Sequence, residues 1–217
     1  MQEASFFLDP IKESQNHRSD FIERIPEITT TTDKAETLAK LAPHHEAAAR
    51  ALGFPKIHYA EQVHGSEIAV ITDSSPLITK GVDALITSAP LLLGIHVADC
   101  GALYLLDRKT GAIGLLHSGK KGTELNITGK TIASMESNFR TNPADLTAVL
   151  APCIRPPHYE IDFAATIQKQ ALSAGISPQH FHDCGLCTAS DLKRFYSYRI
   201  EKGNTGRLLA LLGRLPS

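Results

Sequence analysis

Short apolar runs separated by polar turns recur along the chain, and a few longer segments carry apolar residues at helical spacing. The runs that predict strands occupy residues 57–63, 67–72, 83–87, 91–97, 102–106, 112–116, 146–150 and 195–199, and a final apolar run occupies 208–212. The run at 91–97 is continuous enough in apolar residues to indicate a strand buried on both faces. We therefore expect a chain that contains both strands and helices.

Helices are predicted at four places. Apolar residues at steps of three and four predict a helix over 123–139, with Thr123 as its N-cap. Asp162 can cap another helix that runs to about residue 174. Thr32 and Asp33 can cap a helix through residue 40, and Pro43 should interrupt it before a second helix over 44–52.

The runs 102–106 and 112–116 flank a polar segment that ends in a glycine, which predicts an antiparallel hairpin. If the loop is even-numbered, so that Asp107 faces Ala112, then Ala102 faces His117 and Cys100 lies on the same face. A thiolate and an imidazole would then be able to share one metal ion. A loop with an odd number of residues, or a bulge, would instead place Cys100 and His117 on opposite faces.

Two lysines follow His117 in the sequence Ser-Gly-Lys-Lys-Gly, directly before the predicted helix. Backbone N–H groups at a helix N-terminus, beside Lys120 and Lys121, would suit a phosphate or another anion. A solvated lysine turn is the commoner explanation of so short a motif taken alone.

Other histidines and cysteines give weaker signals. His64 lies at a turn between the runs 57–63 and 67–72, and only partners elsewhere in the chain would make it a ligand. His44 and His45 are expected on the surface of a helix, where adjacent side chains point in different directions. The Cys184-x-x-Cys187 pair has no second pair at zinc-finger spacing, so an independent zinc site is not expected there.

Length, charge and cysteine content narrow the class of protein. With 217 residues and 42% hydrophobic residues, the chain can form one domain over 1–217. A net charge of -1 and a pI near 6.8 give no broad basic field, so a small molecule is expected as the partner rather than nucleic acid or a membrane. No basic and apolar leader opens the sequence, and we expect a cytoplasmic protein with reduced cysteines.

Seven motifs, taken together and in order, resemble the YfiH family, which is also called the laccase-domain or multicopper polyphenol oxidase family. They are Gln62-Val63-His64-Gly65, Asp83-Ala84-Leu85-Ile86-Thr87, Ala98-Asp99-Cys100, His117-Ser118-Gly119-x-x-Gly122-Thr123, Pro152-Cys153-Ile154 with Tyr159-Glu160, Cys187-Thr188, and Phe195-Tyr196-Ser197-Tyr198-Arg199 with Thr205-Gly206-Arg207. The match covers about residues 59–207, and residues 1–55 form a divergent N-terminal part.

This resemblance implies a single α/β (α+β) domain with mixed sheets layered between helices. It also implies a metal, usually zinc with copper as the alternative, held by His64, Cys100 and His117. Three protein ligands leave an open position of the kind found in catalytic zinc sites. One such set of ligands is too few for a multicopper oxidase.

The activities implied are those of a purine nucleoside enzyme, namely phosphorolysis of purine nucleosides, adenosine deamination, or both. Phosphate would then be bound by Lys120, Lys121, Thr123 and Arg207, and Asp83 and Cys153 are further candidates for the same pocket. Cys100, His117 and Asp83 are the predicted catalytic group. The oligomer expected is a monomer or a small homo-oligomer.

Two alternatives stay open, because Lys120 and Lys121 stand where the family has Trp-Arg in its His-Ala-Gly-Trp-Arg-Gly motif. The first is a Cys-His hydrolase that acts on a peptidoglycan precursor or another amide, with Cys100 as the nucleophile and His117 as its base. The second is a non-catalytic relative that keeps the metal for stability.

Overall fold

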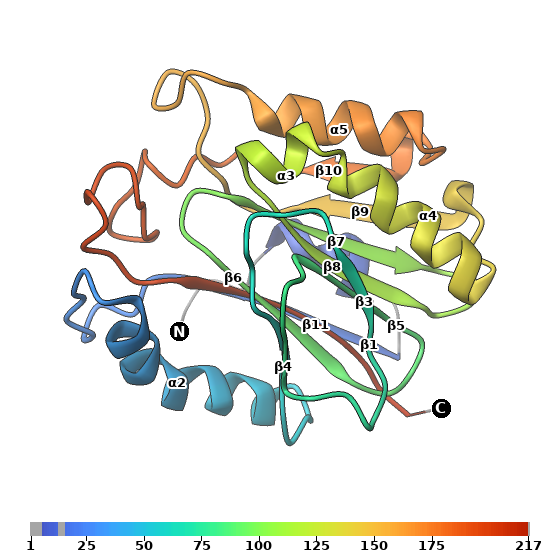
Figure 1. The fold of residues 1–217 in the computed structure, drawn as a ribbon, viewed down its shortest axis with the longest axis horizontal. Coiled ribbons are helices and arrows are strands. Elements are labelled where there is room, and N and C mark those ends of the chain that lie inside the picture. The colour runs from blue at the N-terminus through green and yellow to red at the C-terminus, as the bar shows by residue number, and fades with distance from the viewer. Residues whose placement is uncertain (1–5, 13–15, 217) are drawn as a thin grey trace.

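Two mixed β-sheets packed between helices make up the part of the chain that the computed structural model describes, residues 6–12 and 16–216 (Figure 1). The strands are β1 (His17–Ile22), β2 (His58–Ala60), β3 (Ile68–Val70), β4 (Ile78–Thr79), β5 (Ala84–Thr87), β6 (Leu92–Val97), β7 (Gly101–Asp107), β8 (Ile113–Ser118), β9 (Leu146–Leu150), β10 (Phe181–Asp183) and β11 (Leu208–Arg214). The α-helices are α1 (Asp9–Lys12), α2 (Lys34–Ala51), α3 (Lys120–Glu124), α4 (Ile127–Phe139) and α5 (Phe163–Ser173). One sheet has the order β1-β11-β6-β2-β4, and the other has the order β10-β9-β7-β8-β5-β3.

Both sheets contain parallel and antiparallel neighbours, so the expected fold is confirmed. The strand pairs β2–β6 and β3–β5 are parallel, whereas β7–β8 and β11–β6 are antiparallel. One apolar core lies between the two sheets and continues under α2 on the other face of the five-stranded sheet, and the second core lies between the six-stranded sheet and helices α4 and α5. Along β7, Tyr104 belongs to the first core and Leu105 to the second, which explains why strands buried on both faces read as continuous apolar runs.

Helix α2 covers the five-stranded sheet and runs through Pro43, so the predicted interruption is wrong. Asp33 caps it as expected, since its carboxylate accepts hydrogen bonds from two backbone N–H groups of the first turn. The buried residues at steps of four are Thr37, Leu41, His45 and Ala49. His45 therefore faces the core and not solvent, contrary to the expectation, because this stripe packs on the sheet through the whole helix.

The helix predicted over 123–139 is also different, because two helices share that segment. Helix α3 begins at Lys120 after Gly119, and Asn126, not Thr123, is the N-cap of α4. Asn126 adopts a left-handed conformation with φ 57°, and its side chain accepts a hydrogen bond from the N–H of Gly129. This arrangement ends one helix and starts the next. Helix α5 begins after its predicted cap, Asp162.

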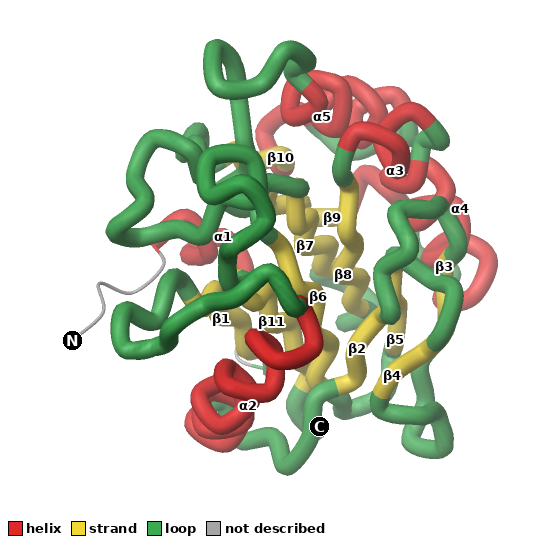
Figure 2. Tube along the Cα trace, turned by 60° about the vertical axis from the view of Figure 1, so that its left-hand side comes forward, coloured by secondary structure: helices red, strands yellow, loops and turns green. Residues whose placement is uncertain are grey.

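Long loops gather beside one end of the two sheets, where they appear green in Figure 2. The runs 57–63 and 67–72 contribute β2 and β3, which belong to different sheets and do not pair. The segment between them therefore crosses from one sheet to the other. Residues 195–199, predicted as a strand, form a turn-rich loop instead. Within residues 6–12 and 16–216, no helix has the length and apolar character needed to cross a membrane.

Candidate metal centre

Three side chains with metal-binding atoms meet where β7 begins and β8 ends. His64 comes from the crossing loop between β2 and β3, Cys100 lies directly before β7, and His117 lies in β8. One ligand atom from each of them lies within 4.8 Å of the others. The β7–β8 register pairs Ala102 with His117, as the even-numbered hairpin predicted. The register therefore explains how Cys100 and His117 come together, while His64 arrives through tertiary structure.

Asp83 holds two of these three residues in place. Its side chain is fully buried at the start of β5, and its Oδ1 lies 2.8 Å from Nδ1 of His117. The same carboxylate accepts hydrogen bonds from the backbone N–H groups of Val63, His64 and Gly65, with N···O distances of 3.1, 3.0 and 2.7 Å. Nδ1 of His117 is thereby occupied, which leaves Nε2 as the atom available to the cluster.

These contacts also support an unusual backbone. Gln62 and His64 adopt φ angles of 64° and 60°, a left-handed conformation that is costly outside glycine. The Asp83 carboxylate binds the N–H groups of this segment and so offsets that cost. Asp83 therefore acts as a positioning residue for both histidines.

The immediate surroundings of Cys100 are equally specific. Asp99 has φ 86°, and its carboxylate accepts hydrogen bonds from the Thr188 hydroxyl and from the backbone N–H of Arg199, both at 2.7 Å. A Cβ atom added to Gly119 would lie 2.5 Å from the Cys100 sulfur. The glycine of the His-Ser-Gly motif is thus required by the close approach of the thiol.

Charge within the cluster favours a thiolate beside a protonated imidazole. Burial on its own raises the pKa of Cys100, but His117 and His64 beside the thiol lower it to about 6. Burial on its own lowers the pKa of His117, but the charges and hydrogen bonds of Cys100 and Asp83 raise it to about 9. The thiolate is both the nucleophilic form of cysteine and the form that binds metals.

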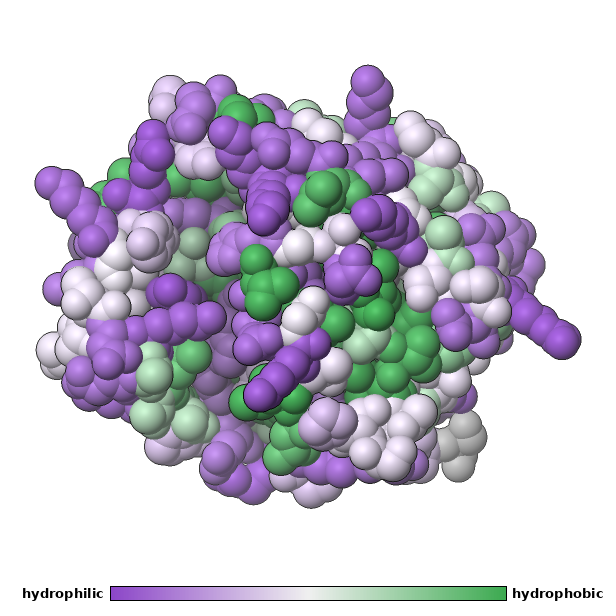
Figure 3. Space-filling model, in the orientation of Figure 1, coloured by the Kyte–Doolittle hydropathy of each residue, from purple (hydrophilic) through white to green (hydrophobic). Residues whose placement is uncertain are grey.

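A cavity of about 750 Å³ opens beside the cluster, and we call it the metal-site cavity. Its volume is in the usual range for small-molecule sites. Hydrophilic side chains cover much of the molecular face shown in Figure 3, including the left-hand side, where the loops of Figure 1 lie. The cavity's aromatic lining residues are Tyr159, Phe163 and Tyr198, and its cationic ones are Lys34, Lys120, Arg199, Lys202 and Arg207.

Some of the other residues predicted for the site line the metal-site cavity, and others do not. Lys120 and Arg207 line the metal-site cavity, whereas Lys121 is exposed and lies outside that lining. The Thr123 hydroxyl is buried, donates to the carbonyl of Gly119 at 2.8 Å and lies 2.9 Å from the Ser118 hydroxyl. Its hydrogen bonds are therefore made within the protein.

Sequence reasoning did not single out Lys34 or Lys202, and it named Tyr198 only as part of a family motif. The fold brings these residues to the cavity from the divergent N-terminal part and from a C-terminal loop. Cys153 is fully buried away from the lining, and burial raises the pKa of its thiol far above the ordinary value. It belongs to the apolar core under α5.

The donor set fits zinc or copper. Thiolate and imidazole are ligands that both metals accept, and Asp83 supplies the hydrogen bond that a metal-binding histidine usually makes with its second nitrogen. In the described residues, no other group of three His, Cys, Asp or Glu side chains brings its ligand atoms this close together. The described chain thus offers one such centre and not several.

The fold and this cluster define an α/β protein that, in its described residues, has a single group of metal-donor side chains, beside a cavity of small-molecule size. The chain belongs to the multi-copper polyphenol oxidoreductase laccase family, whose model matches residues 28–164 and 157–214. The resemblance to the YfiH family is thereby confirmed.

Relatives support this assignment in sequence and in structure. The chain is 32% identical over 209 residues to a protein of Deinococcus radiodurans named purine nucleoside phosphorylase, with 83% of this chain and 80% of that protein covered. The crystal structure of YlmD from Geobacillus stearothermophilus matches with a TM-score of 0.82 at 23% identity, covering 93% of each chain. That of Bacillus licheniformis YfiH, described as a hypothetical protein, matches with a TM-score of 0.80 at 22% identity, covering 92% of this chain and 93% of that one. Both structures share the fold.

Proposed function

We propose that this protein is a zinc-dependent purine nucleoside phosphorylase whose metal is held by His64, Cys100 and His117. The observation that carries the proposal is the convergence of these three donors, with both histidines positioned by Asp83, in a cavity lined with aromatic and cationic side chains. The name of the Deinococcus radiodurans relative supports the substrate class. Zinc bound there would supply a Lewis acid within the cavity.

The lining residues have complementary tasks in this reaction. In phosphorolysis, a phosphate oxygen forms a bond to C1′ of the ribose while the bond from C1′ to the purine nitrogen breaks, and the purine leaves with that electron pair. Cationic side chains such as Lys120 and Arg207 would stabilise the phosphate and the negative charge that develops on the purine. Tyr159 and Tyr198 line the cavity and would supply aromatic surface for a planar base, although the guanidinium groups of Arg199 and Arg207 lie over these rings, 5.3 and 5.9 Å from the centroids.

The proposal is tested by incubating zinc-loaded protein with inosine or adenosine, with and without phosphate, and separating the products by chromatography. We expect free purine base and ribose 1-phosphate only when phosphate is present. Conversion of adenosine to inosine without phosphate would indicate the deaminase activity instead. Absence of turnover in every mixture would leave the non-catalytic alternative.

One observation favours a second function, that of a Cys-His hydrolase. The lowered pKa of Cys100 and the raised pKa of His117 describe a thiolate and imidazolium pair in the metal-free protein. Such a pair can attack an amide carbonyl. This function predicts that iodoacetamide inactivates the metal-free protein toward a peptide or cell-wall amide. Full amide hydrolysis after alkylation of Cys100 would exclude it.

A further inference from the structure

A second cavity, of about 480 Å³, adjoins the metal-site cavity and shares Lys34, Tyr198, Lys202 and Arg207 with it. Its remaining lining is polar or small, and consists of Thr31, Thr32, Gly203 and Thr205. We call this space the cationic arm. Its residues come from the start of α2 and from the segment before β11, which lie side by side at the left of Figure 1.

The three cations of the arm lack carboxylate partners. Throughout residues 6–12 and 16–216, no ion pair within 4.0 Å involves Lys34, Lys202 or Arg207. Arg207 is half-buried, and its Nη1 donates to the carbonyls of Thr205 and Gly206 at 3.3 and 2.8 Å. Burial lowers its pKa, while burial and the charge of Arg207 lower the pKa of Lys34. Like charges thus meet here without a direct ion pair in the described residues, although Glu61 and Asp83 act on Lys34 and Cys100 and Asp99 act on Arg207 from farther away.

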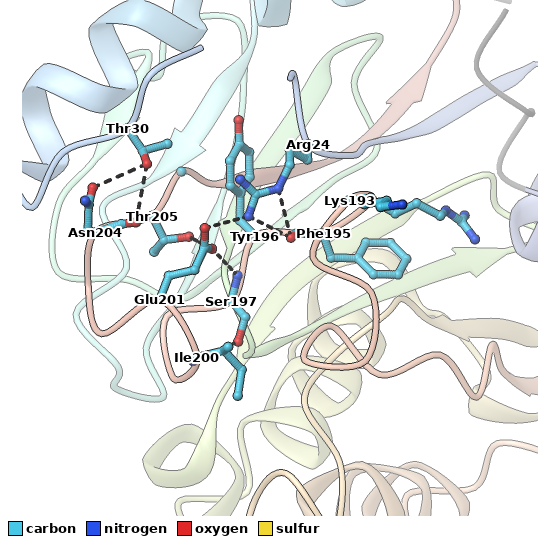
Figure 4. A network of polar contacts seen from close by, with 12 residues as sticks. Arg24, Thr30, Lys193, Phe195, Tyr196, Ser197, Ile200, Glu201, Asn204 and Thr205 are labelled. Atoms are coloured by element: carbon cyan, nitrogen blue, oxygen red, sulfur yellow. Dashed lines mark hydrogen bonds and ion pairs between the residues drawn. The ribbon is translucent and has the colours of Figure 1, made fainter. Parts of the chain in front are cut away.

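The carboxylate adjacent to Lys202 in sequence is already used. Glu201 accepts from Arg24 at 2.7 Å through Oε1, and from the backbone N–H of Ser197 and the Thr205 hydroxyl at 2.9 and 2.6 Å through Oε2 (Figure 4). This network fixes the loop that carries Lys202, so the lysine is held near the arm while its neighbouring acid is turned to other donors.

Other nearby acids are engaged in the same way. Burial lowers the pKa of Arg207, while Tyr198, Cys100 and Asp99 raise it, and the two oxygens of Asp99 are bound by Thr188 and the backbone of Arg199. Glu61, which acts on Lys34, accepts from the backbone N–H of Gly81 at 2.7 Å. Since the whole chain has a net charge of -1, this positive excess is local.

We infer that the cationic arm binds a phosphoryl group, with Arg207, Lys34 and Lys202 as its cationic donors. A guanidinium and two ammonium groups match the charge and oxygen geometry of a phosphoryl dianion better than those of a carboxylate. The inference rests on the proposed function, because it places the phosphate of phosphorolysis in an arm that opens toward the metal site. The same chemistry would hold the 5′-phosphate of a nucleotide.

Binding is measured by isothermal titration calorimetry on zinc-loaded protein, with inorganic phosphate, inosine 5′-monophosphate and inosine as separate probes. The variants are Lys34→Met, Lys202→Met and Arg207→Met, and Lys193→Met in the neighbouring turn is the matched control. We expect each of the three variants to lose about tenfold or more in affinity for a phosphoryl probe, because each removes one charge-assisted contact. Inosine affinity should change less, and the control should match the parent. Thermal melting checks that each variant is folded.

The probes separate the two sources of the phosphoryl group. Loss of inorganic phosphate binding in the variants supports the co-substrate, and loss confined to inosine 5′-monophosphate supports a nucleotide. Unchanged affinity for both probes in folded variants overturns the inference. If phosphorolysis proceeds with an unaltered KM for phosphate in these variants and their affinity for inosine 5′-monophosphate is also unchanged, the inference is wrong and the proposed function stands. If phosphorolysis is absent but the three substitutions still weaken phosphate binding, the cationic arm is supported and the proposed function is wrong.

Discussion

Asp83→Asn removes one charge from a carboxylate that four donors share. Oδ1 accepts from His64 and His117, and Oδ2 accepts from Val63 and Gly65. An asparagine keeps one oxygen and places an NH₂ group where the other stood, so two of the four donors lose their acceptor whichever way the amide turns. Because the three backbone bonds are only partly buried, each lost bond costs toward the low end of ~1–3 kcal/mol, and we expect the free energy of unfolding to fall by about 2–3 kcal/mol.

The same change should weaken the metal site. The hydrogen bond to Nδ1 of His117 fixes the orientation of that ring, and loss of such a partner commonly reduces metal affinity about 10–100-fold. Unfolding by urea measures the stability, and competition with a chromophoric chelator measures the zinc affinity. Both quantities should fall together in Asp83→Asn.

Asp107→Asn is the matched control, because Asp107 is also fully buried. Its Oδ1 accepts from the backbone N–H groups of Lys109 and Thr110, and the hydroxyls of Thr110 and Thr141 also help to hold its pKa below the ordinary value. A hydroxyl can rotate to accept from an amide NH₂ group. The amide can therefore keep both bonds, and zinc affinity should equal that of the parent. Equal zinc affinity in Asp83→Asn and the parent would refute the positioning role of Asp83.

Two further predictions concern close packing and pH. Gly119→Ala should lower zinc affinity and reduce nucleoside turnover by at least about tenfold, since a Cβ 2.5 Å from the Cys100 sulfur must displace it; parental values for both would contradict this contact. Burial lowers the pKa of His45 from 6.5 to about 4, so His45 stays neutral in the folded protein while the unfolded chain takes up a proton below pH 6.5. The free energy of unfolding should therefore fall by up to about 3 kcal/mol as the pH decreases from 6.5 toward 4. Urea unfolding across this range should show a flatter pH dependence for His45→Gln than for His44→Gln, and equal slopes would show that His45 does not contribute.

The sequence was most informative where neighbours in the chain are neighbours in space. The hairpin of β7 and β8 follows from two apolar runs and a turn, and its register correctly brought Cys100 near His117. The caps Asp33 and Asp162 were likewise predicted, because a helix N-cap is set by local hydrogen bonds.

Features that depend on tertiary packing could not be predicted in the same way. The buried stripe of α2 consists of a threonine, a leucine, a histidine and an alanine, which do not form a recognisable apolar pattern. Burial against the sheet outweighs the hydrogen bond lost at Pro43. No local signal tells that β2 and β3 belong to different sheets, or that Lys202 and Lys34 line the same cavity.

Among the site residues, too, local features were predictable and features that depend on tertiary structure were not. Motif resemblance predicted His64 as a third ligand, and its approach depends on Asp83 binding the backbone of a segment twenty residues earlier in the chain. The predicted phosphate role of Lys121 and Thr123 assumed a helix that begins at Thr123. The break at Asn126 and the internal hydrogen bonds of Thr123 change that geometry.

The central claim is that one metal held by His64, Cys100 and His117 is required for nucleoside phosphorolysis. Elemental analysis of the purified parent, Cys100→Ala and Cys184→Ala tests it, with phosphorolysis of inosine measured on the same samples. Cys184 is partly buried like Cys100 but lies outside the cluster, so its variant is the matched control. We expect about one zinc per chain and full activity in the parent and in Cys184→Ala, with both lost in Cys100→Ala. Equal zinc in all three proteins, or activity in Cys100→Ala without metal, would contradict the claim.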